Sequence, residues 1–251
     1  MKSLSGKVAI VTGGGRDIGR ATAVKLAQNG AAVVVNYLSS AGGAEETVKA
    51  IEAFDGKALA VQADVTKLSD VENMVKQATI AFGDTIHIVV NNAGGLIARK
   101  KMEEMDVAFW DTVLDVNLKS MFLVCKAALP HMADGGSIIN LASLAARDGG
   151  GGGAIAYATS KGGVLTFTRG LAKELKSRKI RVNSVSPGLI GTTFHDTFTP
   201  DEARKMVAGK TLAEREGTSE DVANAVYFLA SDESSYINGE SIEINSGLYF
   251  I

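Results

Sequence analysis

The chain has 251 residues, 46% of them hydrophobic, with a net charge of −2 and a pI near 6.0. This length and composition predict one domain with a sizeable core, and the charge balance excludes the basic surfaces of proteins that bind nucleic acid or anionic membranes. No N-terminal apolar run is long enough for a signal peptide or a membrane span, and the single cysteine, Cys125, excludes an internal disulfide framework. We therefore expect a cytoplasmic, enzyme-sized domain, without a metal site because the three histidines show no ligand spacing.

Short apolar runs alternate with segments of helical periodicity along the chain. The expected strands span 7–12, 31–36, 58–62, 86–90, 137–141, 181–186 and 241–244. The expected helices span 18–28, 44–54, 70–82, 106–129, 157–176 and 219–230. We expect 187–217 to be irregular and the glycine run 149–153 to form a mobile loop. The alternation predicts a single α/β domain of Rossmann type, a doubly wound parallel sheet of about seven strands with helices on both faces.

A glycine-rich turn, Gly13 to Gly19, follows the first expected strand and opens the first expected helix. This is the context of a nucleotide-phosphate site, because glycine lets the backbone approach a pyrophosphate and helix N–H groups meet its charge. Asp17 interrupts the glycines, and we expect it to cap the helix and to tolerate an unusual backbone angle. A carboxylate beside phosphates is unfavourable unless Arg16 screens it.

Tyr157 and Lys161 are four residues apart, which places both side chains on one face of a helix. Because an ammonium group favours phenolate, we expect a lowered pKa for Tyr157 and a role as general acid or base. The same spacing also occurs on solvated helix faces. It gains weight here from the glycine turn, from Ser143 and from the segment Asn91-Asn92-Ala93-Gly94.

With these motifs in this order, the chain resembles the classical short-chain dehydrogenase/reductase family over nearly its whole length, although Asp17 replaces the middle glycine of the family's first motif. The resemblance implies that Tyr157 donates a proton to the substrate oxygen, Ser143 hydrogen-bonds that oxygen and Lys161 holds the nicotinamide ribose. It implies that Asn117 orders a water in the proton path, whereas a solvated helical asparagine is the alternative.

The resemblance further implies a nicotinamide dinucleotide cofactor and a homotetramer. Asp64 and Val65 would bracket the adenine ring and Ile190 would meet the carboxamide, whereas Asn91 to Gly94 could instead only stabilise the central sheet. The residues that the family places at the cofactor correspond to Gly13, Arg16, Asp17, Ile18, Gly19, Asn36, Tyr37, Ser39, Asp64, Val65, Asn91, Ala93, Gly94, Tyr157, Lys161, Pro187, Gly188, Ile190 and Thr192.

The choice between the two nicotinamide cofactors depends on charge at the end of the second expected strand. An acidic residue there would bind the adenosine ribose and repel a 2′-phosphate, but the position is Tyr37, flanked by Asn36, Leu38, Ser39 and Ser40. Arg16 stands where family members that prefer NADPH carry a basic residue, unless it is an ordinary surface cation. NADPH is therefore the expected cofactor and NADH the alternative.

The segment Thr193 to Thr199 lies within 188–217, the region expected to form the substrate lid. This segment, Arg16-Asp17 and Arg147-Asp148 resemble bacterial reductases of 4-deoxy-L-erythro-5-hexoseulose uronate, a product of alginate breakdown. The resemblance implies a small keto sugar or aldehyde acid as substrate and 2-keto-3-deoxygluconate as product. The residues expected at the substrate are Ser143, Arg147, Tyr157 and His195.

Two other functions remain open at this point. A 3-oxoacyl-(acyl-carrier-protein) reductase would present a basic patch to its acidic partner, and Arg99-Lys100-Lys101 offers one. A nucleotide-sensing binding module would have lost its catalytic groups. The intact set Ser143, Tyr157, Lys161 and Asn117 argues against that module.

Overall fold

Seven strands form one parallel sheet in the computed structural model, which describes residues 3–251. They are β1 (Val8–Val11), β2 (Ala32–Tyr37), β3 (Lys57–Gln62), β4 (Ile86–Asn91), β5 (Met132–Leu141), β6 (Arg181–Pro187) and β7 (Ser241–Ile244). Their order in the sheet is β3-β2-β1-β4-β5-β6-β7, so the direction of winding reverses between β1 and β4. Ligands of such sheets bind outside the carboxyl ends of the strands at this reversal.

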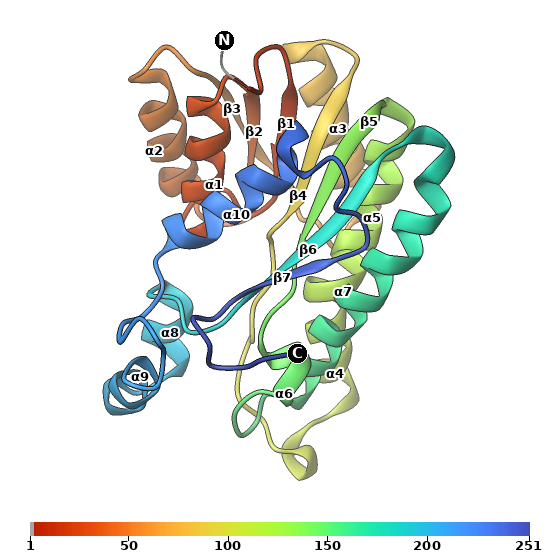
Figure 1. Cartoon of the computed structure of the whole chain (residues 1–251). Coiled ribbons are helices and arrows are strands. Elements are labelled where there is room, and N and C mark those ends of the chain that lie inside the picture. The colour runs from red at the N-terminus through yellow and green to blue at the C-terminus, as the bar shows by residue number, and fades with distance from the viewer. Residues whose placement is uncertain (1–2) are drawn as a thin grey trace.

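Helices cover both faces of the sheet (Figure 1). One face carries α1 (Asp17–Gln28), α2 (Ala41–Glu52) and α10 (Ser219–Ala230), and the other carries α3 (Leu68–Phe82), α5 (Ser120–Ala128) and α7 (Ile155–Glu174). Successive side chains of β1 point to opposite faces of the sheet, so its continuous apolar run packs against the helices on both faces. Ala9 and Val11 pack on the α1 side and Ile10 on the α5 side. The predicted fold class is confirmed.

The structure differs from three of the predictions of secondary structure. The expected helix 106–129 is divided into α4 (Val107–Leu114), a π-turn over Asp115–Lys119, and α5, because the chain widens by one residue within the turn. The fifth strand begins at Met132 rather than Ser137, through two glycines that sequence periodicity does not mark as strand. The stretch 187–217 contains α8 (Thr193–Phe198) and α9 (Asp201–Ala208), two short polar helices held by distant partners.

Helix α10 illustrates how local sequence sets an element that the prediction placed correctly. The Thr218 hydroxyl accepts a hydrogen bond from the backbone N–H of Asp221 at 3.2 Å, and the Asp221 carboxylate accepts one from the backbone N–H of Thr218 at 2.8 Å. This reciprocal capping box begins the helix at Ser219. The apolar side of α10, including Val222 and Val226, then packs beneath the sheet beside α1.

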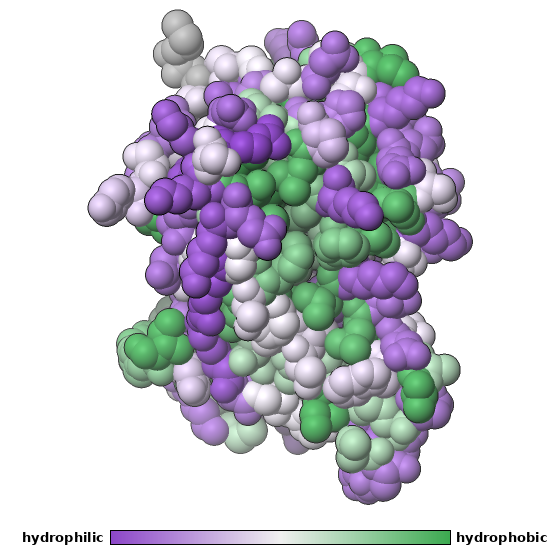
Figure 2. Space-filling model, turned by 90° about the vertical axis from the view of Figure 1, so that its right-hand side faces the viewer, coloured by the Kyte–Doolittle hydropathy of each residue, from purple (hydrophilic) through white to green (hydrophobic). Residues whose placement is uncertain are grey.

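The face formed by α4, α5 and α7 carries exposed apolar side chains (Figure 2). An apolar hollow on it is lined by Leu114, Leu118, Phe122, Gly163 and Phe167 together with Lys119. Within residues 3–251, no helix is long and apolar enough to cross a membrane. No group of three or more metal-ligating side chains occurs in the same part of the chain.

Candidate active site

The glycine turn after β1 is fixed by a polar network from β4. The Thr12 hydroxyl accepts hydrogen bonds from the backbone N–H groups of Asn92 and Ala93, both at 3.0 Å, and the Asn92 amide donates to the carbonyls of Thr12 and Gly13. Gly19 must lack a Cβ, which would overlap the Gly13 carbonyl oxygen. These contacts hold the turn and the start of α1 in one arrangement.

The start of α1 has unmet hydrogen-bond donors. Its N-cap residue is Arg16, whose side chain makes no cap hydrogen bond, so the first backbone N–H groups of α1 are available to an anion. Asn36 lies beneath the turn, where its side-chain oxygen accepts from the Gly13 N–H at 3.2 Å and its amide donates to the Ala63 carbonyl. A dinucleotide pyrophosphate fits this arrangement.

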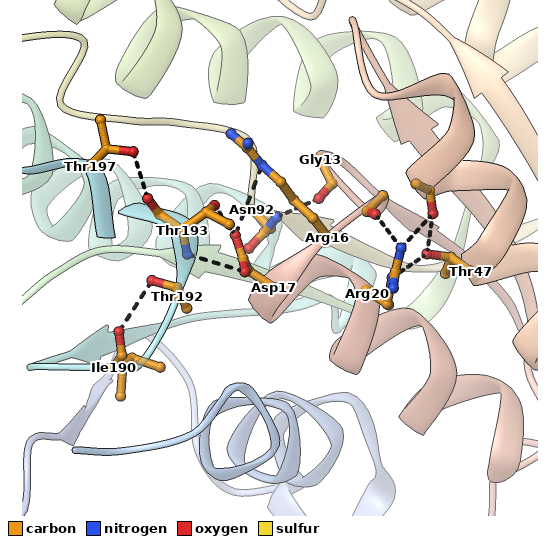
Figure 3. Close-up of polar contacts among 12 residues, drawn as sticks. Gly13, Arg16, Asp17, Arg20, Thr47, Asn92, Ile190, Thr192, Thr193 and Thr197 are labelled. Atoms are coloured by element: carbon orange, nitrogen blue, oxygen red, sulfur yellow. Dashed lines mark hydrogen bonds and ion pairs between the residues drawn. The ribbon is translucent and has the colours of Figure 1, made fainter. Parts of the chain in front are cut away.

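The prediction for Asp17 was half right. Its φ of +47° is the unusual backbone angle expected, but Asp17 does not cap the helix, because it is the first helical residue and not the N-cap. Its carboxylate instead accepts hydrogen bonds from the backbone N–H and the hydroxyl of Thr193, and lies 3.9 Å from the Arg16 guanidinium (Figure 3). Arg20, on the opposite side of the turn, donates to Thr47 of α2.

Tyr157, in the first turn of α7, and Ser143, just beyond β5, share a hydrogen bond at the carboxyl edge of the sheet. The Lys161 ammonium, 4% exposed, donates to the Leu141 carbonyl at 2.7 Å and lies 5.6 Å from the centre of the Tyr157 ring. The helix spacing thus does bring Tyr157 and Lys161 together, and the strand end adds Ser143. A phenol, a hydroxyl and an ammonium at one edge can polarise a carbonyl and supply it with a proton.

The expected direction of the tyrosine pKa is wrong for the free protein. Burial raises the pKa of Tyr157, and the Ser143 hydrogen bond opposes that rise only in part. Burial also lowers the pKa of Lys161 to about 8. The neighbouring ammonium does not offset the effect of burial on the pKa of Tyr157, so the phenol keeps its proton at neutral pH.

Asn117 sits in the π-turn and is 2% exposed, so the alternative of a solvated helical asparagine is wrong. Its side-chain oxygen accepts from the Gly95 N–H at 3.0 Å and its amide donates to the Gly95 carbonyl at 2.8 Å. A Cβ on Gly94 would lie 2.6 Å from the Asn117 side-chain oxygen and 3.3 Å from the Lys161 ammonium. The segment after β4 therefore sits directly against both predicted catalytic residues.

The short helix α8 brings aromatic side chains over Tyr157. The Phe194 ring centre lies 5.8 Å from that of Tyr157, 5.0 Å from that of His195 and 5.3 Å from that of Phe198. The His195 ring nitrogen Nδ1 hydrogen-bonds the Thr199 hydroxyl at 2.9 Å, and burial, with a smaller effect of Arg204, lowers the pKa of His195. His195 is therefore neutral at pH 7 and offers a hydrogen bond, not a charge.

Comparison with known proteins decides the family. Over residues 13–249 the chain matches the family described as Enoyl-(Acyl carrier protein) reductase. It is 40% identical to the 3-oxoacyl-(acyl-carrier-protein) reductase FabG of Staphylococcus aureus strain Mu50, over 97% of this chain and 98% of that protein. The chain belongs to the short-chain dehydrogenase/reductase family. It is therefore an oxidoreductase of a family that uses NAD(P)H.

Solved structures of the family share the whole fold. A short-chain dehydrogenase/reductase from Serratia marcescens is 38% identical with a TM-score of 0.91, covering 98% of each chain. A blue fluorescent protein from a metagenomic library, solved in complex with NADPH, is 35% identical with a TM-score of 0.91, covering 99% of this chain and all of that one. None of these relatives is described as a uronate reductase, so the narrower resemblance stays a prediction.

The residues expected at the adenine side of the dinucleotide fall at the ends of β2 and β3. Tyr37 is the last residue of β2, and Ser39 is exposed just beyond it. The Asp64 carboxylate accepts hydrogen bonds from the N–H and the hydroxyl of Thr66, and these, chiefly the hydroxyl, lower the pKa of Asp64. Val65 packs into the core, so its backbone is better placed than its side chain to meet a ligand.

Asn91 has the sheet-stabilising role rather than a side chain directed at the cofactor. Its amide donates to the Asn140 side chain at 2.8 Å, inside the sheet, and to the buried Cys125 sulfur. On the nicotinamide side, Ile190 is 3% exposed and bridges to Gly217, and the Thr192 hydroxyl donates to the Ile190 carbonyl. Pro187 and Gly188 lead from β6 into this segment and so shape the turn beside the site.

Arg147 does not face the lid. Both its Nε and Nη2 donate to one carboxylate oxygen of Glu243 on β7, at 3.1 and 3.0 Å, in a mostly buried pair. Sequence analysis missed that partner because it is 96 residues away. The expected mobility of the glycine run is not evident either, since the Gly152 and Gly153 carbonyls accept from Arg99 and Lys100.

Four residues that contact the site were not among the site residues predicted from the sequence. Thr12 and Asn92 hold the glycine turn, Thr193 meets Asp17, and Arg99 donates to the Phe198 carbonyl at 3.0 Å and to the Gly152 carbonyl at 2.9 Å. Thr12 and Asn92 belong to motifs that were recognised, so their polar side chains were a usable signal. Thr193 was noted only as part of the lid segment and Arg99 only as part of a basic patch, because their partners are 176 and 99 residues away.

Proposed function

We propose that this chain is an NADPH-preferring carbonyl reductase that acts on a small substrate bearing a carboxylate. The observation that carries the proposal is the meeting of Ser143, Tyr157 and Lys161 beneath α8, beside a turn suited to a pyrophosphate. A bound nicotinamide supplies the hydride. Tyr157 donates its proton to the substrate oxygen, Ser143 hydrogen-bonds that oxygen and Lys161 holds the ribose.

The protonation states of Tyr157 and Lys161 suit the proton transfer that accompanies carbonyl reduction. A carbonyl that accepts hydride needs a proton on oxygen, and burial keeps the Tyr157 phenol protonated at neutral pH. Lys161, with a pKa of about 8, is mostly an ammonium at that pH and can replace the proton through ordered water. Asn117 contributes by holding the Gly95 segment in place beside Lys161.

The preference for NADPH rests on the end of β2 and on the start of α1. Tyr37 and its neighbours 36–40 include no carboxylate that would repel a 2′-phosphate, and the Arg16 side chain is 69% exposed and able to reach one. The relative solved with NADPH has the same fold over its whole length. Gly13, Ile18, Gly19, Ala93, Gly94 and Thr192 supply backbone or small side chains around the remainder of the dinucleotide.

For the substrate we propose 4-deoxy-L-erythro-5-hexoseulose uronate, reduced to 2-keto-3-deoxygluconate. Arg147 is neutralised by Glu243, and Arg204 is neutralised by Asp196 and Glu216. Arg99, by contrast, donates only to carbonyl groups, and no ion pair involves it among residues 3–251. It therefore keeps a full positive charge at the lid, where a substrate carboxylate would meet it, while neutral His195 offers a hydrogen bond to a hydroxyl.

The relative from Staphylococcus aureus supports a second candidate, reduction of a 3-oxoacyl thioester on an acidic carrier protein. Arg99, together with Lys101, would then face the carrier protein. The lid favours the small substrate, because α8 is fastened at one end by Asp17 and at the other by Arg99.

Loss of NADPH absorbance with the uronate and with an acetoacetyl thioester tests the choice. We expect the uronate to be reduced with the higher kcat/KM, and Arg99→Gln to raise its KM about tenfold, because a hydrogen bond to a charged group is lost. Lys101→Gln is the matched control and should change KM less than twofold. Rapid reduction of the thioester without activity on the uronate would instead establish the carrier-protein reductase.

A homotetramer remains part of the proposal. The apolar side chains on the face of α4, α5 and α7 (Figure 2) would prefer burial against another copy. Phe122 of α5 is 46% exposed. Light scattering at micromolar concentration tests it, and a monomer would contradict it.

A further inference from the structure

Asp17 occupies a backbone conformation that glycine adopts more easily. Its φ of +47° is in the left-handed region, which is strained for a residue with a side chain. The family motif has glycine at this position. The Asp17 side chain does not offset the strain by capping α1, because α1 has no side-chain cap. The carboxylate must therefore be explained by what it contacts outside the turn.

That contact is Thr193, the first residue of α8. One carboxylate oxygen of Asp17 accepts from the Thr193 hydroxyl at 2.5 Å and the other from its backbone N–H at 3.3 Å (Figure 3). The two residues are 176 positions apart, so the pair joins the start of α1 to the start of the lid. It therefore connects the two segments between which the dinucleotide is proposed to lie, the glycine turn and 187–192.

We propose that the Asp17–Thr193 pair is a clasp that fastens α8 to the cofactor turn, and that Asp17 is a positioning residue acting through Thr193. This proposal rests on the proposed function for what the clasp retains, a nicotinamide dinucleotide. A ligand held between the two segments must wait for the pair to open before it leaves, and α8 keeps Phe194 over Tyr157 while the pair is closed.

Apart from this contact, the first turn of α8 is held by the ring contact of Phe194 with Tyr157 and by the ion pair of Asp196 with Arg204 of α9, which is itself part of the lid. Neither α8 nor α9 contains a fully buried residue, so no apolar core holds them. The other end of α8 is tied by Arg99 to the Phe198 carbonyl, and α9 by Arg204 to Glu216. A helix of six residues is not stable alone, so opening of one end should loosen the whole segment.

The test compares Asp17→Gly, Thr193→Val and the double variant by two measurements. The first is the dissociation rate of NADPH by stopped-flow fluorescence, and the second is the rate of limited proteolysis within 193–208 in the free protein. We expect each single change to raise both rates about three- to tenfold, and the double variant to do no more than either alone.

Two further variants separate the clasp from a general effect on folding. Thr197→Val removes a hydroxyl of the same helix that donates to the Thr193 carbonyl and not to Asp17, so both rates should stay within twofold of the wild type. Asp17→Asn keeps an acceptor and tolerates the left-handed angle, so it should restore part of the effect. Asp17→Gly should not lower the unfolding temperature, since glycine relieves the strain.

Rates that multiply in the double variant, or an Asp17→Gly protein with unchanged rates, would overturn the clasp. Failure of NADPH to bind any variant, wild type included, would defeat the proposed function. The proteolysis comparison would still decide whether Asp17 fastens the lid.

Discussion

The floor of the site and its lid are built in different ways. The predicted catalytic residues are Asn117 in the π-turn before α5, Ser143 beyond the end of β5, and Tyr157 and Lys161 on α7, and the inner faces of α5 and α7 are part of the core. The lid helices α8 and α9 have no fully buried residue and are attached through hydrogen bonds and ion pairs at partly exposed side chains. One region is held by packing and the other by polar side chains.

Because of this difference, opening the floor costs more free energy than opening the lid. Opening the floor exposes buried apolar surface and so approaches global unfolding, whereas opening the lid breaks a few exposed polar contacts. Chemistry that must be the same for every substrate is therefore kept on rigid elements. Substrate choice is left to a segment that can change without loss of the fold.

The largest effect should come from removing the proton donor in the floor. Tyr157→Phe should lower kcat by about 10²–10⁴, the usual contribution of a positioned general acid, and leave NADPH binding close to that of the wild type. Steady-state kinetics and fluorescence titration measure the two quantities. A folded variant with most of the wild-type rate would contradict the assignment of the floor.

The pH dependence of the free energy of unfolding tests whether Lys161 is buried in the floor. Its pKa is 10.5 in an unfolded chain and about 8 when folded, so between these values only the unfolded chain holds the proton. The free energy of unfolding due to this group therefore rises with pH through that window, by about 3 kcal/mol. Urea unfolding at several pH values should show this rise in the wild type and not in Lys161→Met. Parallel pH profiles would show that the ammonium is solvated.

Arg16 tests the exposed edge of the cofactor turn. Arg16→Ala should narrow the preference for NADPH over NADH by about two- to fivefold, a small factor because the guanidinium is largely exposed and already near Asp17. The ratio of kcat/KM for the two cofactors measures it, with Lys25→Ala as a control, because Lys25 is a cation at the other end of α1 and contacts the Tyr227 ring. A wild type that prefers NADH would overturn the assignment of Tyr37.

The smallest effect on stability should come from the lid itself. Arg204→Met removes the ion pairs with Asp196 and Glu216, yet it should change the free energy of unfolding by at most about 1 kcal/mol, because the pairs are partly exposed. Proteolysis within 193–208 should nevertheless become faster. If the variant lost several kcal/mol, the lid would be part of the core's cooperative unit and the comparison would fail.

Much of the floor could be predicted from the sequence because its signals are local. Continuous apolar runs mark strands covered on both faces, and the Tyr157–Lys161 spacing specifies one helix face. Helix α10 was placed without error because its capping box lies within four residues of its start. In each case the information lies within about one turn of helix or one strand.

The lid and several polar partners could not be predicted because their determinants are far apart in the chain. Helix α8 depends on Asp17 and on Arg99, and nothing within 193–198 marks it as helical. Arg147 was predicted to bind the substrate because the sequence does not show that Glu243 pairs with it and neutralises its charge. The direction of the Tyr157 pKa was wrong because the effect of burial, which the sequence does not display, is larger than that of the Ser143 hydrogen bond.

The π-turn at Asp115–Lys119 limits which changes of chain length this helix can accept. An α-helix advances about 100° per residue, so deletion of one residue there would restore a regular α-helix and rotate α4 by that angle relative to α5. The Asn117 side chain could then no longer meet Gly95, even with every residue type retained. We expect relatives to differ here in residue type far more readily than in residue number.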